Sequence, residues 1–415
     1  MTNEFSLAPS DLSKWAQLVV HNGLGLKEGQ QLLIGAPVEA LPLIREVSVE
    51  AYKAGCSLVT PMLTDSALEV ARIRWSHETY LSTDNVWFSE AVASAYTDGA
   101  ARLAITGGNP NLFEGLEQSR INTVAKSRVA SRKLTAPFSS ESIINWSVMP
   151  YPFVDWASAI WPEQPRSEAQ AKLWSLLRSA LRLDMDDPVQ AWQNHNQKLS
   201  EKSQMLNEMR FEALRFRGPD TDLSVGLANL HRWHGGQTKA QNGCLGNTNM
   251  PTEEVFTCPH KMKVDGYAVS TRPLVVGGQK IDGIRTEFNQ GVLTDVKSIN
   301  GKSIASLETM LKADEGAKRL GEVALVPHSS LISKMNQVFL NTLLDENSSC
   351  HIAFGQSYRK TLISGTDISE DEAVERGANS SSVHFDWMIG SEHLDIDGVA
   401  GTNVTPLFRA GEWVV

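Results

Sequence analysis

The chain has 415 residues, more than one hydrophobic core usually supports, so its length predicts two domains. Hydrophobic residues make up 41% of the sequence, an ordinary share for a globular protein. The 38 basic and 48 acidic side chains give a formal net charge of -10, and no basic block interrupts the acidic background. Such a chain repels polyanions and anionic membrane surfaces. We therefore expect neither nucleic acid nor a membrane as a partner.

The N-terminal segment 1–15 has no basic region followed by an apolar one, so it does not predict a signal peptide. No apolar run approaches the roughly 20 residues that a membrane-spanning helix needs. The four cysteines, Cys56, Cys244, Cys258 and Cys350, are scattered and form no CxxC pair. This spacing indicates reduced, buried thiols, and neither a disulfide framework nor a structural zinc site. The sequence therefore predicts a cytoplasmic protein.

In the first half of the chain, helical patterns alternate with short apolar runs that predict strands. The predicted helices cover about 10–22, 41–53 and 89–97, and the predicted strands cover 30–36, 56–60 and 102–106. Alternation of this kind favours βαβ units and a mostly parallel sheet. Residues 1–216 are therefore predicted to form an N-terminal α/β domain.

The pattern changes after a long helical stretch over about 167–215, where a Gly-Pro pair in 217–220 ends the helix. Strand-like runs separated by Gly or Asn follow at 223–230, 262–269, 273–276 and 291–299, with predicted helices at 303–320 and 331–344. The second half, 217–415, is therefore predicted to be a β-rich α+β domain with an antiparallel or barrel-like sheet.

A histidine and an aspartate two residues apart, His384 and Asp386, give the first indication of a metal site. On a strand they share a face, while Phe385 and Trp387 point to the opposite side. An imidazole beside a carboxylate suits a divalent transition metal, but it also suits a simple ion pair on a half-buried strand. On this segment alone both interpretations stay open. The pair His231 and His234 lacks an accompanying HExxH motif, so we expect surface or packing roles for it.

Further acidic and histidine side chains precede apolar runs in the same half. Only one of the neighbours Glu253 and Glu254 can point into a given site, because adjacent strand residues face opposite ways. A carboxylate at the mouth of a buried strand, as Glu322 is, costs free energy unless it is paired. The full candidate set is Glu254, Glu322, Glu346, His351, Tyr358, His384 and Asp386. It exceeds the needs of one zinc ion and suits two metals roughly 3.5–4 Å apart.

Four motifs, in order, make the sequence similar to the aminopeptidase T and aminopeptidase S family of dinuclear metallopeptidases. They are PTEEVFT at 251–257, GEVALVP at 321–327, DEN…HIAFG at 345–355 and HFDWMIG at 384–390, with FRAGEW closing the chain at 408–413. The resemblance implies five metal ligands, namely Glu254, Glu322, His351, His384 and Asp386. It further implies that Glu322 bridges two ions, that Glu346 and Tyr358 lie close to them, and that the protein is a homodimer.

The resemblance implies an aminopeptidase that releases single N-terminal residues from short peptides. Water between two divalent ions, Zn, Co, Mn or Mg, would have its pKa lowered toward about 7. Glu254 or Glu346 is expected to carry the water's proton to the leaving amine. Tyr358 is expected to donate a hydrogen bond to the anionic oxygen or to complete the coordination sphere. The sequence leaves the assignment between these roles open.

Two rival functions follow from the same residues. His351, His384 and Asp386 form a two-His-one-carboxylate set, which is typical of non-haem Fe(II) oxygenases. Ring-cleaving dioxygenases of dihydroxypyridines are similar to the peptidase family in fold, but they need one metal and no bridging carboxylate. The second rival is a non-catalytic protein in which these side chains are structural. Nucleotide binding is rejected because the Gly-rich segment 23–29 precedes its strand.

Overall fold

The computed structural model describes residues 5–276 and 279–415, and its contacts divide them into two compact units. The N-terminal unit holds residues 5–194 and 237–250, and the C-terminal unit holds 195–236 and 251–415. Residues 1–4 of the predicted N-terminal segment lie outside the described residues. Among the described residues, no helix is long and apolar enough to cross a membrane.

These ranges differ from the predicted 1–216 and 217–415 in two places: residues 195–216 lie in the C-terminal unit, and the segment 237–250 returns to the N-terminal unit. There it packs so closely on the helical turn before the first strand that a Cβ atom on Gly246 would lie 2.4 Å from the carbonyl oxygen of Gly23. The backbone N–H of Val148 also donates to the carbonyl of Thr248 over 2.8 Å. Such backbone pairing leaves no pattern in side-chain hydrophobicity, so the sequence does not reveal it.

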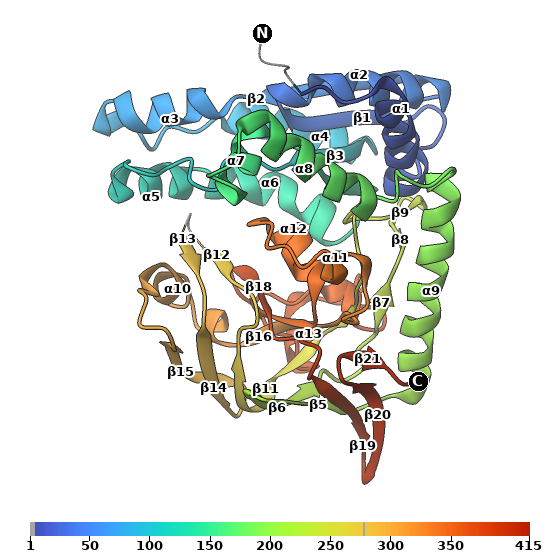
Figure 1. Ribbon diagram of the computed structural model, residues 1–415, viewed down its shortest axis with the longest axis vertical. Helices are drawn as coiled ribbons and strands as arrows, with labels where there is room; N and C mark the ends of the chain where they lie inside the picture. The colour runs from blue at the N-terminus through green and yellow to red at the C-terminus, as the bar shows by residue number, and fades with distance from the viewer. Residues whose placement is uncertain (1–4, 277–278) are drawn as a thin grey trace. The chain divides into compact units, whose positions relative to one another are not determined.

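A four-stranded parallel sheet with strand order β2-β1-β3-β4 forms the centre of the N-terminal unit (Figure 1). Its strands are β1 (Gln31–Pro37), β2 (Leu58–Thr64), β3 (Ala101–Thr106) and β4 (Trp146–Pro150). The central strand β1 is buried over Leu32, Leu33 and Ile34, as an apolar run between two parallel neighbours requires. The predicted parallel sheet is therefore confirmed.

Helices connect and cover these strands. They are α1 (Pro9–Leu18), the π-helix η1 (Val19–Leu24), α2 (Leu41–Lys53), α3 (Ser66–Trp75), α4 (Val86–Thr97), α5 (Gln118–Ser127), α6 (Val129–Ser140), α7 (Val154–Ile160) and α8 (Arg166–Ala180). The next helix, α9 (Pro188–Met209), begins in this unit and belongs to the C-terminal unit from residue 195 onward. The predicted long helix over 167–215 is thus two helices. The break lies at Arg182, whose φ of 57° is left-handed, and Pro188 begins the second helix.

Two large antiparallel sheets form most of the C-terminal unit, in strand orders β15-β14-β11-β6-β5-β19-β20-β21 and β18-β17-β16-β10-β7, and a two-stranded sheet joins β12 (Leu274–Val276) to β13 (Gln279–Ile281). The first contains β5 (Ala213–Gly218), β6 (Thr221–Leu227), β11 (Pro259–Val269), β14 (Ile284–Asn289), β15 (Val292–Ser298), β19 (Asp395–Ala400), β20 (Asn403–Arg409) and β21 (Glu412–Trp413). The second contains β7 (His234–Gly235), β10 (Val255–Thr257), β16 (Leu320–Leu325), β17 (His351–Gly355) and β18 (His384–Met388). The prediction of a β-rich, antiparallel second half is confirmed.

Apart from its share of α9, the helices of this unit are short: α10 (Ala305–Met310), α11 (Leu331–Lys334), α12 (Thr342–Asp345) and α13 (Glu370–Glu375). The predicted helices 303–320 and 331–344 are therefore wrong over most of their length. The carboxylate of Asp314 accepts hydrogen bonds from the N–H groups of Ala317 and Ser382. These contacts hold the chain in a turn within the predicted helix 303–320. The carboxylate of Asp345 accepts from Phe339 and Asn341, which folds the intervening residues into a loop.

The core of the C-terminal unit lies between its two sheets. The ring of Phe354 on β17 packs 5.8 Å from Phe288 on β14, 5.1 Å from Phe385 and 5.8 Å from Trp387, between ring centres. Residues two apart on β17 and β18 thus share the core face, and the residues between them face the opposite side of the five-stranded sheet. That opposite face carries the candidate functional residues.

Replacing Phe354 with alanine should lower the free energy of unfolding by about 3–5 kcal/mol, because the cavity loses contacts with three rings. Urea unfolding followed by tryptophan fluorescence measures the change. Val404→Ala is the control, since Val404 is 49% exposed and should change stability by less than about 0.5 kcal/mol. Equal losses in the two variants would contradict this account of the core.

Candidate metal centre

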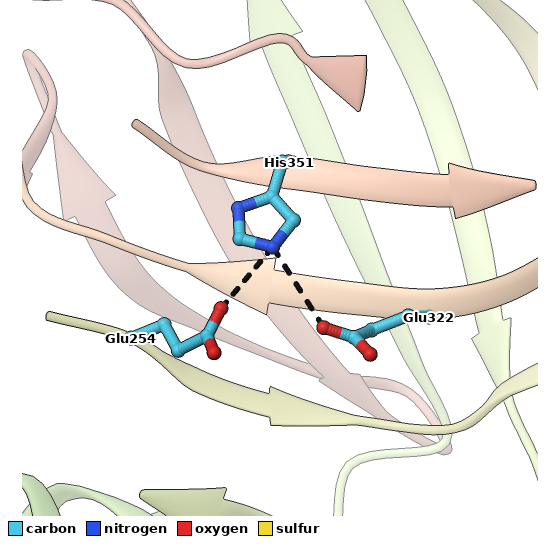
Figure 2. Close-up of side chains that lie close together, drawn as sticks. All are labelled: Glu254, Glu322 and His351. Atoms are coloured by element: carbon cyan, nitrogen blue, oxygen red, sulfur yellow. Dashed lines mark ion pairs between the residues drawn. The ribbon is translucent and has the colours of Figure 1, made fainter. Parts of the chain in front are cut away.

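Three buried side chains from neighbouring strands converge at one point, as Figure 2 shows. The Nε2 atom of His351 lies 3.2 Å from Oε2 of Glu254 and 3.7 Å from Oε1 of Glu322. One ligand atom from each residue falls within 4.8 Å of the others. Glu254 immediately precedes β10, Glu322 lies on β16 and His351 begins β17, so adjacent strands bring the three together.

A β-bulge points Glu322 into this cluster. The register between β16 and β17 shifts between Leu320 and Glu322, so Gly321 is the extra residue. Leu320 and Val323 both belong to the hydrophobic core, and this change of parity leaves Glu322 on the opposite face. A Cβ atom at Gly321 would lie 2.3 Å from the carbonyl oxygen of Gly355, so this position has room only for glycine.

The strand β18 adds His384 and Asp386 beside the three buried side chains. His384 Nε2 lies 3.5 Å from Oδ1 of Asp386 and 3.8 Å from Oε2 of Glu322. The two oxygens of Glu322 therefore face different histidines, Oε1 toward His351 and Oε2 toward His384. The structure brings together all five side chains that the resemblance names as ligands. Their role in metal binding stays a prediction.

Both histidines are oriented by a backbone carbonyl. His351 Nδ1 lies 3.1 Å from the carbonyl oxygen of Ser349, and His384 Nδ1 lies 2.7 Å from that of Gln356. A carbonyl only accepts, so Nδ1 carries the hydrogen and Nε2 of the neutral ring is left with its lone pair toward the carboxylates. This arrangement is typical of histidines that ligate metals.

While the imidazole of His351 is neutral, two buried atoms of the cluster have no hydrogen bond: Glu254 Oε2 and His351 Nε2, which lie 3.2 Å apart. A buried polar atom without a partner costs about 1–3 kcal/mol. A divalent cation between the imidazole nitrogen and the carboxylate oxygens would satisfy both atoms. The residues present therefore fit a metal ion of mixed His and carboxylate preference, such as Zn, Co or Mn.

The fourth carboxylate, Glu346, follows α12 and is also buried. Burial, and then the charges of Asp386 and Glu254, raise the pKa of Glu346 well above its usual range. Burial also raises the pKa of Asp386, but the charge and hydrogen bond of His384 outweigh it and lower that pKa to about 2. Within this hydrogen-bonded pair Glu346 therefore holds the proton and Asp386 is ionised.

Tyr358 lies beside the cluster, and its ring centre is 4.8 Å from that of His384. Burial, followed by the charges of the nearby carboxylates, raises the pKa of Tyr358 well above its usual range. The phenol is therefore neutral and can donate a hydrogen bond. The sequence-predicted residues Glu346 and Tyr358 thus both lie at the site, and their catalytic roles stay predictions.

Sequence reasoning missed Asn347, which is fully buried and connects two parts of the site. Its side-chain oxygen accepts a 2.7 Å hydrogen bond from the N–H of Glu253, and its Nδ2 donates to Glu346 Oε1 over 3.4 Å. The neighbouring Glu253 pairs with His195 at 3.7 Å, away from the metal cluster. The structure therefore shows which of the two neighbouring glutamates faces the cluster: it is Glu254, and the sequence alone did not distinguish it from Glu253.

His231 and His234 do not join the cluster. His231 Nδ1 lies 3.0 Å from the carbonyl oxygen of Ala228, and His234 Nε2 lies 2.6 Å from that of Lys360. Burial lowers the pKa of His231, and burial together with the charge of Lys360 lowers that of His234 to about 4. Both are neutral packing histidines at neutral pH.

A cavity of about 250 Å³ opens beside His384 and Asp386. It is lined by Pro273, Leu274, Met310, Asn341, Thr342, Asp345, His384, Phe385, Asp386 and Met388. Apolar side chains thus lie next to the two polar residues of the cluster. The cavity combines an apolar wall with groups that attract a cation.

A buried set of carboxylates and imidazoles with unsatisfied ligand atoms fits a metal-dependent enzyme. A model of the family described as "Thermophilic metalloprotease (M29)" matches residues 9–413. Aminopeptidase T from Thermus aquaticus is 43% identical over 407 residues, which cover 98% of each chain. The solved structure of wild-type AmpT from Thermus thermophilus has a TM-score of 0.91 at 42% identity and covers 98% of this chain and 99% of that one. The chain therefore belongs to the M29 family and is a metalloaminopeptidase.

A more distant likeness concerns the fold alone. The structure of 2,5-dihydroxypyridine dioxygenase from Pseudomonas putida KT2440 has a TM-score of 0.52 at 9% identity, covering 99% of each chain. The expected similarity in fold between dihydroxypyridine dioxygenases and this chain is therefore confirmed. At this identity the likeness carries no argument about the reaction.

Protons should compete with divalent ions for the two histidines. Burial lowers the pKa of His384, but the charge and hydrogen bond of Asp386 outweigh it and raise that pKa to about 9. Below this pH the ring is protonated and must lose its proton before it can bind a metal. Between about pH 6 and pH 9, we expect the affinity for Mn²⁺ or Co²⁺ to rise with pH. Each proton that metal binding releases contributes a factor of about ten per pH unit.

Competition with a fluorescent chelator across this pH range measures the affinity of the metal-free protein. The surface histidine His393, whose side chain is 66% exposed, provides the control variant His393→Gln, which should keep the same pH dependence. An affinity that stays constant from pH 6 to pH 9 would show that neither His351 nor His384 is a ligand.

Proposed function

We propose that the chain releases single N-terminal residues from short peptides by means of two divalent ions held by Glu254, Glu322, His351, His384 and Asp386. The observation that carries this proposal is the position of Glu322, whose two oxygens face two different histidines at 3.7 and 3.8 Å. A carboxylate whose two oxygens face two separate histidines is placed to bridge two metal ions, and a single ion does not require such a bridge.

Bound divalent ions would supply a hydroxide at neutral pH and would polarise the scissile carbonyl. The protein's own side chains then accept and donate the protons. Glu346 is the stronger candidate for the general base and acid: burial and neighbouring carboxylates raise its pKa well above the usual range, and bound cations would lower that pKa again, so that the carboxylate can accept a proton and return it. Glu254 is the second candidate. The neutral phenol of Tyr358 donates a hydrogen bond to the carbonyl oxygen as negative charge develops on it.

The preference for free N-termini follows from charge. The α-ammonium of a peptide is attracted to Asp386, whose pKa is lowered to about 2 by His384 against the opposing effect of burial, so that it is ionised at neutral pH. An internal peptide bond brings no such cation. The cavity of about 250 Å³ beside Asp386 and His384 supports a substrate of one or a few residues on this side of the cluster.

The dioxygenase alternative uses His351, His384 and Asp386 with a single iron. It leaves Glu254 and Glu322 buried beside the histidines without a function. Membership in a metallopeptidase family also favours the hydrolase. Elemental analysis distinguishes the two, because the peptidase binds close to two divalent ions per chain and the oxygenase binds one iron.

Replacing Glu322 with glutamine should lower kcat for a leucine chromogenic amide by about 10³-fold or more, since the amide carries no charge to bridge two ions. Elemental analysis of the same variant should find fewer than two metals per chain. The control Glu308→Gln changes an exposed glutamate of α10 and should keep wild-type rates. Wild-type turnover by Glu322→Gln would refute the bridging role.

We also propose that the protein is a homodimer, as the family resemblance implies. In the N-terminal unit, α3, α4 and the turn between them expose large apolar side chains: Leu68, Trp75, Tyr80 and Trp87 are 67–78% exposed. Exposed apolar surface that gathers on one part of a protein is typical of an interface. Sedimentation velocity should give the mass of two chains, and Trp75→Glu with Trp87→Glu should give that of one. A wild-type monomer would exclude the dimer.

A further inference from the structure

A lysine that none of the predictions includes lies at the edge of the site. Lys360 belongs to the short 3-10 helix η6 (Arg359–Thr361), two residues after Tyr358. Its carbonyl oxygen lies 2.6 Å from His234 Nε2, and the N–H of Arg232 donates to the next carbonyl, that of Thr361, over 2.7 Å. The backbone at this position is therefore fixed on both sides by the segment that leads into β7.

The side chain of Lys360 extends between two aromatic rings. Its Nζ atom lies 5.3 Å from the ring centre of Phe256 and 5.6 Å from that of Tyr358, within the range of cation–π attraction. Phe256 follows Glu254 by two residues, so the two side chains leave the strand on the same face. The ring centre of Tyr358 also lies 4.8 Å from that of His384. The ammonium group thus lies beside the carboxylate cluster.

Its hydrogen-bond donors are not used within the protein. Across residues 5–276 and 279–415, no carboxylate oxygen lies within 4.0 Å of Lys360 Nζ, and Nζ donates no hydrogen bond. A ring face attracts an ammonium group without accepting its N–H groups along a fixed direction. The side chain is half-buried, and burial lowers the pKa of its ammonium against the opposing charges of Glu322 and Glu254. A charged group with free donors is therefore held in place beside the site and remains open to a ligand.

We propose that Lys360 is a catalytic residue for peptide hydrolysis, in that its ammonium donates a hydrogen bond to the scissile carbonyl oxygen as this oxygen becomes anionic. The role rests on the proposed aminopeptidase function. When the water oxygen bonds to the carbonyl carbon, the π electron pair moves onto the carbonyl oxygen. The ammonium keeps its proton throughout. The pair returns when the C–N bond breaks, and the leaving amine takes the proton that the carboxylate base removed from water.

The charge of the site explains why a cation is needed here. A forming oxyanion is repelled by the nearby carboxylates Glu254, Glu322 and Asp386, and in a dry site this repulsion is strong. Tyr358 donates a hydrogen bond but brings no charge. The two histidines face the carboxylates through Nε2 and anchor themselves through Nδ1, so neither has an N–H to offer. Lys360 would therefore add the charge of a protein side chain to that of the two proposed ions.

The test compares three variants with the wild type, all loaded with metal. Lys360→Met keeps the length and apolar contacts but removes the charge, and should lower kcat about 100-fold with little change in KM. Lys360→Arg keeps the charge and should recover much of this loss. Lys172→Met is the matched control, because Lys172 lies over Trp161 at 4.3 Å in the N-terminal unit and should keep wild-type kinetics.

A second measurement is independent of turnover. A phosphinic pseudodipeptide, whose tetrahedral anion replaces the scissile amide, should bind Lys360→Met about 100-fold more weakly by calorimetry, whereas free leucine should bind equally. Metal content and Tm should match those of the wild type. Unchanged kcat and inhibitor affinity in Lys360→Met would overturn the role of the lysine alone, as would a loss explained by fewer metals or a lower Tm. An inactive, metal-free wild type would overturn the proposed function as well.

Discussion

The C-terminal unit must hold four carboxylates beside one another inside an apolar protein, and its other features follow from this constraint. Burial and mutual repulsion both oppose ionisation, which is why burial first, then neighbouring charge, raises the pKa of Glu346, and burial raises that of Glu322. Removing such charges from water costs several kcal/mol each unless cations lie close by. In the metal-free protein the protonated imidazole rings of His351 and His384 supply this positive charge.

A rigid sheet meets this constraint because it fixes the charged groups against a packed core. On β18, His384 and Asp386 alternate with the rings of Phe385 and Trp387, which pack against Phe354 of β17, so packing on the far side of the strand sets the position of these two candidate ligands. On β16, strict alternation from Leu320 would place Glu322 on the core face. The bulge at Gly321 shifts the alternation by one residue, so that Glu322 faces the site. A change in the core should therefore disturb the site, and the free energy that orders the ligands comes largely from apolar contacts.

The sequence predicted the parts of this arrangement that depend on local spacing. The two-residue separation of His384 and Asp386 placed them on one face, and the alternating elements of the first half predicted the parallel sheet. It did not predict the end of the helix expected from residue 303, because Asp314 is held by the N–H of Ser382, 68 residues away. The convergence of the candidate ligands depends on strand order, which only the resemblance to a known family implied.

A site with surplus negative charge attracts cations and the α-ammonium of a substrate, but it also opposes the anion that forms during hydrolysis. Protons on the imidazoles cannot resolve this conflict, because metal binding displaces them. Lys360 differs from these groups, since the rings of Phe256 and Tyr358 hold its charge and no ligand exchange removes it. A cation supported by aromatic faces would therefore add to the positive charge of the bound ions as negative charge develops in the transition state.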